Sequence, residues 1–265
     1  MSSSEPTKRS RDSLGNVIVV ALGVSIVCSI LVSTAATVLK PRQEANEERF
    51  RQTIVLDVAN LYEPGADVGS LFEQIETRIV DLETGDYVDM DDPAAFDPVA
   101  ASRDPAQSVA IPPDEDIAGI KRRSNLAPVY VVRTPTGAVE QVILPVYGKG
   151  LWSTLYGFLA LEPDGNTVRG LQFYEHAETP GLGDGIDKPA WRAQWPGKLL
   201  TDAAGEPRIE VVRGQAAPDS PYQVDGLSGA TLTGRGVMNL VRYWTSAEGF
   251  GPYLERVREE AEDNG

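Results

Sequence analysis

The chain has 265 residues, 42% of them hydrophobic, which is enough for one domain with a hydrophobic core and an additional segment. Its 39 acidic residues outnumber its 24 basic residues and give a formal net charge of −15. Because affinity for a nucleic-acid backbone comes mainly from Lys and Arg, this charge argues against nucleic acid as a partner.

An uncharged apolar segment covers residues 17–39. As a helix it would extend about 34 Å, close to the ~30 Å hydrocarbon thickness of a bilayer. The apolar region of a signal peptide is shorter, roughly 7–15 residues, so we predict an uncleaved transmembrane helix. Small residues recur along one face and favour close contact with a partner helix in the membrane: Ser25, Ser29, Ser33 and Ala36.

The flanks of this segment predict its orientation. Lys8, Arg9 and Arg11 lie in the short tail, residues 1–16, although basic residues also follow the segment. Charge counting applies to short tails, whereas large domains cross regardless of charge, so we expect a cytoplasmic tail and the main domain outside the cytoplasm. Cys28, the single cysteine, lies inside the segment, which excludes an intrachain disulfide and any multi-cysteine iron–sulfur or zinc site.

Residues 40–120 are expected to form a helical stalk followed by an acidic loop region. The apolar spacing of Ile54, Val55, Val58 and Leu61 continues through Leu71, Ile75 and Val80, which predicts mostly helix to about Asp81. Residues 81–116 mix many aspartates with prolines, a composition typical of solvated loops. Their spacing fits no EF-hand calcium loop, and whether they bind another cation stays open.

Residues 121–265 have the pattern of a folded domain in which strands precede helices. Short apolar segments at 128–132, 139–145, 154–161 and 168–174 are separated by turn residues and predict an antiparallel sheet, with residues 209–212 as a further candidate strand. A helical stripe of apolar residues follows, formed by Val237, Leu240, Val241 and Trp244. This segregation predicts an α+β fold with helices flanking the sheet.

The sequence Asp-Gly-Leu-Ser-Gly-Ala-Thr, residues 225–231, lies at the entrance to that helix. Helix N-termini bind phosphate because the first N–H groups lack partners and the dipole is positive there. Gly226 and Gly229 would allow close approach of an anion, and Ser228, Thr231 and Thr233 carry hydroxyls. An ordinary Ser- or Thr-capped turn has the same residue types, so the residues alone leave both interpretations open.

The same string resembles the flavinylation motif of FMN-carrying subunits of membrane redox pumps. Residues 27–36, 145–153, 156–161 and 176–183 extend the likeness over nearly the full chain, which resembles the family of C subunits of the sodium-translocating NADH:quinone reductases. The resemblance implies FMN bound to Thr231 through a phosphoester bond. It also implies a bacterial inner-membrane protein with a single span and a periplasmic FMN-binding domain.

The resemblance further implies that residues 178–183 pack beside the flavin ring. In that role Thr179 would bond a polar edge and Leu182 would cover an apolar face, with Tyr147 and Trp152 as neighbours. His176, the only histidine, either makes a structural hydrogen bond or lines the ring. The expected FMN-binding residues are therefore Thr231, Asp225, Gly226, Ser228, Gly229, Ala230, Thr233, Glu178, Thr179, Leu182, His176, Tyr147 and Trp152, with no catalytic or metal-binding residue.

The function implied is an electron relay within a membrane NADH:ubiquinone reductase that pumps Na⁺. FMN would pass single electrons between redox centres of other subunits, and the absence of a dinucleotide fingerprint argues against direct reaction with NADH. A flavin transferase that uses FAD is expected, because no base lies beside Thr231 in the sequence. The alternatives are the FMN-carrying G subunit of the related ferredoxin:NAD-type complex and a cofactor-free, membrane-anchored binding module.

Overall fold

The computed structural model describes residues 14–263, so most of the predicted N-terminal tail, residues 1–16, lies outside the described residues. Contacts divide the chain between Arg49 and Phe50, and we describe each part by itself. Helix α1 (Leu14–Val58) contains the predicted apolar segment and is, among the described residues, the one helix long and apolar enough to cross a membrane. The apolar side chains of that segment are exposed.

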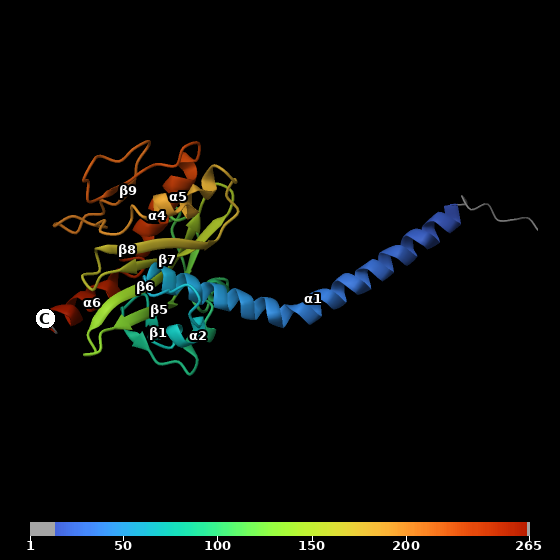
Figure 1. The fold of residues 1–265 in the computed structure, drawn as a ribbon, viewed down its shortest axis with the longest axis horizontal. Coiled ribbons are helices and arrows are strands. Elements are labelled where there is room, and N and C mark those ends of the chain that lie inside the picture. The colour runs from blue at the N-terminus through green and yellow to red at the C-terminus, as the bar shows by residue number, and fades with distance from the viewer. Residues whose placement is uncertain (1–13, 264–265) are drawn as a thin grey trace, which may run out of the picture. The chain divides into compact units, whose positions relative to one another are not determined.

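A six-stranded antiparallel sheet forms the centre of the compact part, in the order β2-β1-β5-β6-β7-β8 (Figure 1). Its strands are β1 (Ile75–Asp81), β2 (Tyr87–Val88), β5 (Leu126–Arg133), β6 (Val139–Lys149), β7 (Thr154–Leu161) and β8 (Val168–Glu175). The four strands predicted between residues 128 and 174 are therefore confirmed, and neighbouring strands are joined by tight turns. Two small sheets accompany it: β3 (Ser108–Ala110) with β4 (Arg122–Ser124), and β9 (Glu210–Val211) parallel to β10 (Gln223–Val224).

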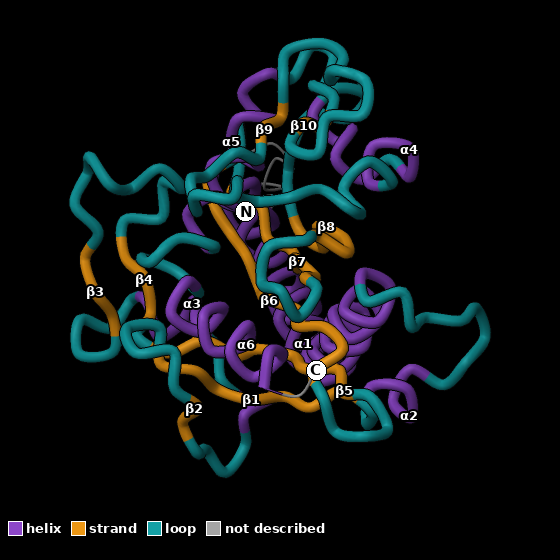
Figure 2. Tube along the Cα trace, turned by 90° about the vertical axis from the view of Figure 1, so that its left-hand side faces the viewer, coloured by secondary structure: helices purple, strands orange, loops and turns teal. Residues whose placement is uncertain are grey.

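Helices cover both faces of the sheet. They are α2 (Val68–Phe72), α3 (Pro98–Ser102), α4 (Pro189–Arg192), α5 (Thr231–Trp244) and α6 (Gly251–Asp263), with single 3₁₀ turns η1 (Pro93–Ala95) and η2 (Gly183–Asp187). In both ribbon and tube views, β9, α4 and α5 gather at one end of the sheet (Figures 1 and 2). The predicted α+β class with an antiparallel sheet and flanking helices is confirmed.

Strand alternation creates a hydrophobic core on each face of the sheet, because successive side chains point to opposite sides. On β6, Val142 and Leu144 belong to the core under α5 and α6, whereas Ile143 between them belongs to the core under the end of α1. The predicted stripe of α5 fills the first core, with all of its members buried: Val237, Leu240, Val241 and Trp244.

The prediction of helix for residues 75–81 is wrong. The segment is β1, which pairs along its length with β5 and also with β2. The β-branched residues Ile75, Thr77, Ile79 and Val80 suit a strand that is partly buried on both faces, and pairing with β5 outweighs the weak helical spacing. The compact part begins at Phe50 and includes this strand, so it starts well before residue 121.

The acidic region, residues 81–116, contains β2, η1, α3 and β3 between its loops. Several carboxylates accept backbone hydrogen bonds there. Asp97 caps α3 by accepting from the N–H groups of Val99 and Ala100, and Asp116 accepts from Ile120 and Lys121. Within the described residues, no group of three or more His, Cys, Asp or Glu side chains could hold a metal ion.

Candidate functional site

Helix α5 begins at Thr231 without a side-chain cap. Its N-cap residue is Ala230. Among the described residues, no side chain caps the backbone N–H groups of its first turn. Alanine is a poor N-cap, so the sequence leaves these N–H groups available to another acceptor. Ser228 and Thr231 are both exposed, and Gly229, at φ 75°, forms the turn between them. The interpretation as an ordinary Ser- or Thr-capped turn does not fit this geometry.

A buried carboxylate joins α5 to two loops. Glu178 Oε2 accepts a 2.6 Å hydrogen bond from Thr233 Oγ1, and its Oε1 accepts from the N–H groups of Trp152 at 2.9 Å and Ser153 at 3.3 Å. Gly150 and Gly183 leave room for this carboxylate: a Cβ at Gly150 would lie 2.5 Å from Oε1, and one at Gly183 would lie 2.8 Å from Glu178 Cβ. Segments 150–153, 178–183 and 231–234 are thereby held together.

The environment of Glu178 favours its ionised form. Burial acts to raise the pKa, but hydrogen bonds from the Thr233 hydroxyl and from the backbone of Trp152, Ser153 and Leu151 outweigh it, so the pKa of Glu178 lies below its usual value. The carboxylate is thus a charged, structural acceptor under the first turn of α5.

An apolar rim is formed by three exposed side chains in the segments that Glu178 holds together: Trp152, Leu182 and Leu232. Their exposed fractions are 67%, 46% and 51%, which is high for large apolar side chains. Leu182 lies directly against Gly229, where a Cβ would come within 2.8 Å of Leu182 Cδ2. The turn that presents Leu182 is closed by the Thr179 carbonyl, which accepts from the N–H groups of Leu182 and Asp184.

Asp225 anchors the start of the motif. Its Oδ1 accepts from Ala216 N–H at 2.7 Å, and its backbone N–H and Oδ2 bond the two ends of the Gln194 amide at 2.9 and 3.2 Å. Its backbone carbonyl accepts from Trp191 Nε1 at 2.8 Å. Gly226 N–H donates to the Gly214 carbonyl at 2.8 Å.

A groove of about 430 Å³ adjoins the motif. One wall consists of residues 211–215, and the other of residues 225–229 together with Thr231 and Gly234. The groove opens beside the exposed Thr231 hydroxyl, and Arg213 brings a positive charge to the opposite wall. Arg213 and Gln215 were not predicted, because nothing in their spacing separates them from other loop residues.

Two of the predicted FMN-binding residues, Tyr147 and His176, make contacts that support the fold. Tyr147 is 92% buried, contacts Trp244 with ring centroids 4.8 Å apart, and has a pKa raised by burial, so it belongs to the core and not to the surface around Thr231. His176 Nδ1 accepts from Glu178 N–H at 3.2 Å, and Nε2 lies 2.7 Å from Asp187 Oδ2. An accepting Nδ1 requires the proton on Nε2, which donates to Asp187. Of the two roles considered for His176, the structural hydrogen bond fits.

Residues 150–246 match the family described as FMN-binding domain, a range that includes Thr231, Glu178 and the apolar rim. The chain is 46% identical over 269 residues to the C subunit of the Na(+)-translocating NADH-quinone reductase of Yersinia pestis, with full coverage of both chains. The protein of the same name from Pseudomonas aeruginosa is 47% identical, with 94% and 97% coverage.

The chain belongs to the family of Na(+)-translocating NADH-quinone reductase C subunits. Solved structures of this family agree with the fold. The Shewanella oneidensis NqrC crystal structure has a TM-score of 0.76 and 36% identity, covering 81% of this chain and 99% of that one. The crystal structure of the C subunit from Parabacteroides distasonis has a TM-score of 0.63 and 27% identity, covering 82% and 96%. The resemblance drawn from the sequence is confirmed.

Proposed function

We propose that this chain is an electron-relay subunit of a Na⁺-translocating NADH:ubiquinone reductase and carries FMN on Thr231 through a phosphoester bond. The observation that carries the proposal is the exposed hydroxyl of Thr231 at the uncapped N-terminus of the 14-residue helix α5. Family membership and the FMN-binding domain match support the choice of cofactor.

The residues around Thr231 fit FMN. The free N–H groups of the first turn of α5 and the positive end of its dipole suit a phosphodiester. The apolar rim of Trp152, Leu182 and Leu232 provides apolar surface for a flat aromatic ring, and the groove between residues 211–215 and 225–229 provides polar groups beside it. The hydrogen bond between Thr233 and Glu178 fixes the first turn of α5 relative to the loop that carries Leu182.

Attachment requires a separate enzyme. Within the described residues, no hydrogen bond joins the Thr231 hydroxyl to a side chain that could serve as a base, so the hydroxyl is a weak nucleophile. With FAD as donor, a flavin transferase would join the FMN phosphorus to Thr231 Oγ1. The bond between the two phosphates of FAD would break, AMP would leave, and the hydroxyl proton would go to a base of that enzyme.

FMN, when bound, can accept and donate electrons one at a time. The part of the chain itself is to hold the group at an exposed position, where centres in other subunits can approach it. A covalent bond suits that role, because a noncovalent flavin at an open surface would dissociate. Helix α1 would hold the chain in the bacterial inner membrane with a cytoplasmic N-terminus and a periplasmic FMN domain, and its small-residue face would contact a membrane-embedded subunit.

Peptide mass analysis of protein from a host that makes a flavin transferase tests the proposal. The peptide with Thr231 is expected to carry the mass of FMN less one water, and Thr231→Ala is expected to abolish it. Thr231→Ser keeps a hydroxyl and should retain some FMN, whereas Ser228→Ala removes the other exposed hydroxyl and should retain all of it. An unmodified wild-type peptide would overturn the proposal and leave a cofactor-free, anchored module.

A further inference from the structure

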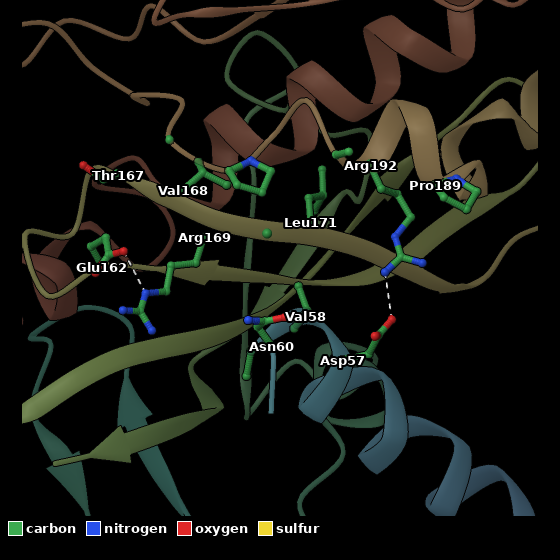
Figure 3. Close-up of a pocket in the computed structure, with 15 residues that line it drawn as sticks. Asp57, Val58, Asn60, Glu162, Thr167, Val168, Arg169, Leu171, Pro189 and Arg192 are labelled. Carbon is green, nitrogen blue, oxygen red and sulfur yellow. Dashed lines mark hydrogen bonds and ion pairs between the residues drawn. The ribbon is translucent and has the colours of Figure 1, made fainter. Parts of the chain in front are cut away.

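The end of helix α1 is fixed on the sheet at a polar groove of about 720 Å³ (Figure 3). A Cβ at Gly170 of β8 would lie 2.9 Å from the Val58 carbonyl oxygen, so backbone meets backbone there. The buried Gln141 amide donates a 3.0 Å hydrogen bond to the Ala59 carbonyl, just beyond the last turn. Ile54, Val55 and Leu56 are buried in the core beneath.

Arg192 crosses this groove from α4 to α1. Its Nη2 donates a 2.8 Å hydrogen bond to Asp57 Oδ2, and the same nitrogen donates to Gln172 Oε1 on β8. In Figure 3 the Arg192 and Asp57 side chains point toward each other across the groove. The Arg192 side chain is 28% exposed, so the ion pair is partly shielded from solvent.

The residues beside Arg192 bond Asp225, the first residue of the motif at 225–231, which we call the flavin motif. Trp191 is buried, and its indole N–H donates to the Asp225 carbonyl at 2.8 Å. Gln194 forms a two-sided contact with Asp225, through its Oε1 to the backbone N–H and through its Nε2 to Oδ2. One short segment, residues 191–194, therefore bonds the end of α1 on one side and residue 225 on the other.

We propose that Arg192 is a positioning residue for the flavin motif: it fixes α4 against the end of α1, and α4 in turn fixes Asp225. The proposal deepens the proposed function, since the group that it positions is the FMN on Thr231. It requires a rigid end of α1, a bond from it to α4, and bonds from α4 to Asp225, and the described residues provide all three.

The same groove offers a matched control. Arg169 on β8 also lines it and pairs with Glu162 at 2.7 Å and Glu140 at 3.4 Å. Its ion pairs connect β8 with β6 and with the residue that follows β7, and they do not involve residues 191–194. Its exposed fraction, 30%, is close to the 28% of Arg192, so loss of either guanidinium removes a similarly buried charge.

Hydrogen exchange on the full-length chain in detergent, made without a flavin transferase, tests the coupling without FMN. Arg192→Met is expected to accelerate exchange at the amides of Asp225 and Gly226, which donate to Gln194 and Gly214, by roughly threefold to tenfold, the factor expected for one lost hydrogen bond. Asp57→Asn, a milder change at a partly exposed residue, should accelerate the same amides. The double variant should exchange little faster than either single variant, because both substitutions break the same ion pair.

Exchange in β6 measures global opening and separates positioning from lost stability. The proposal is overturned if Arg192→Met accelerates β6 and the amides of Asp225 and Gly226 equally, if it leaves these two amides unchanged, or if Arg169→Met accelerates them as much. The second readout is the fluorescence anisotropy of FMN in flavinylated protein, expected to fall for Arg192→Met and to match wild type for Arg169→Met. Lack of FMN in all variants would refute the proposed function, while the exchange data would still decide the coupling.

Discussion

Thr233 Oγ1 donates a 2.6 Å hydrogen bond to Glu178 Oε2, in a pair with exposed fractions of 0% and 4%. The bond joins the first turn of α5 to the loop before η2, next to Thr231. Thr233→Val removes the donor and keeps the side-chain shape, which leaves a buried charged oxygen with one acceptor site empty. We expect a loss of about 1–3 kcal/mol in the free energy of unfolding.

Thermal unfolding of the detergent-solubilised chain measures this loss. Ser228→Ala removes an exposed hydroxyl from the same motif and should change stability by less than about 0.5 kcal/mol. Equal midpoints for Thr233→Val and Ser228→Ala would show that the bond contributes nothing.

Glu178 should make the fold sensitive to acid. Its pKa is lower in the folded chain than its usual 4.5, so the ionised group stabilises the fold above about pH 4.5 and loses that effect as the pH falls through the folded-state value. Glu178→Gln cannot titrate. Its stability deficit relative to wild type should therefore be largest near neutral pH and shrink below about pH 4.5. A deficit that stays constant across this range would contradict the assignment.

Gly236 should tolerate no side chain, whereas Gly234 on the same helix should. A Cβ at Gly236 would lie 2.5 Å from the Lys149 carbonyl oxygen, so α5 must move away from β6. We expect Gly236→Ala to destabilise the chain by about 1–3 kcal/mol, measured by the unfolding midpoint.

A Cβ at Gly234 would instead meet a side-chain atom, Val211 Cγ1, at 3.1 Å. Helix propensity favours alanine by up to about 1 kcal/mol, which offsets the small shift that Val211 must make. Gly234→Ala should therefore lie within about 1 kcal/mol of wild type. A larger loss for Gly234→Ala than for Gly236→Ala would refute this account of how α5 packs on β6.

The proposed membrane topology has a direct measurement. A C-terminal alkaline phosphatase fusion, active only outside the cytoplasm, should be active, and a C-terminal green fluorescent protein fusion exported by the same route should be dark. A chain that begins at Phe50 lacks the apolar segment of α1 and should leave the membrane fraction. An inactive phosphatase fusion together with a fluorescent green fluorescent protein fusion would indicate the opposite orientation.

Local patterns in the sequence were sufficient for the central strands and for α5, because their periodicity and turn residues are complete over short spans. They failed at β1, where Ile75 and Val80 fit a weak helical spacing and pairing with distant residues 126–132 decides the structure. The same limit applies to the site. The motif could be found by its residues, but the anchoring of Asp225 by Gln194 depends on a contact across 31 positions.

Tyr147 shows that a resemblance does not settle where a side chain lies. The resemblance implied a place beside the cofactor, whereas the structure buries the Tyr147 ring in the core against Trp244. Glu178 was predicted as a flavin neighbour. In the structure its buried carboxylate accepts hydrogen bonds from Trp152 N–H and from the Thr233 hydroxyl on α5.

Each oxygen of the Asp225 carboxylate accepts a hydrogen bond from the surrounding fold. Ala216 and Gln194 hold its two oxygens, so a modifying enzyme that draws this side chain out of its place would have to act before the loop closes or break both bonds. If the proposed transferase acts in that way, modification would be fastest on newly made protein and slow on protein that has folded without flavin. The fraction of chains that carry FMN would then depend on how soon after synthesis each chain meets the enzyme.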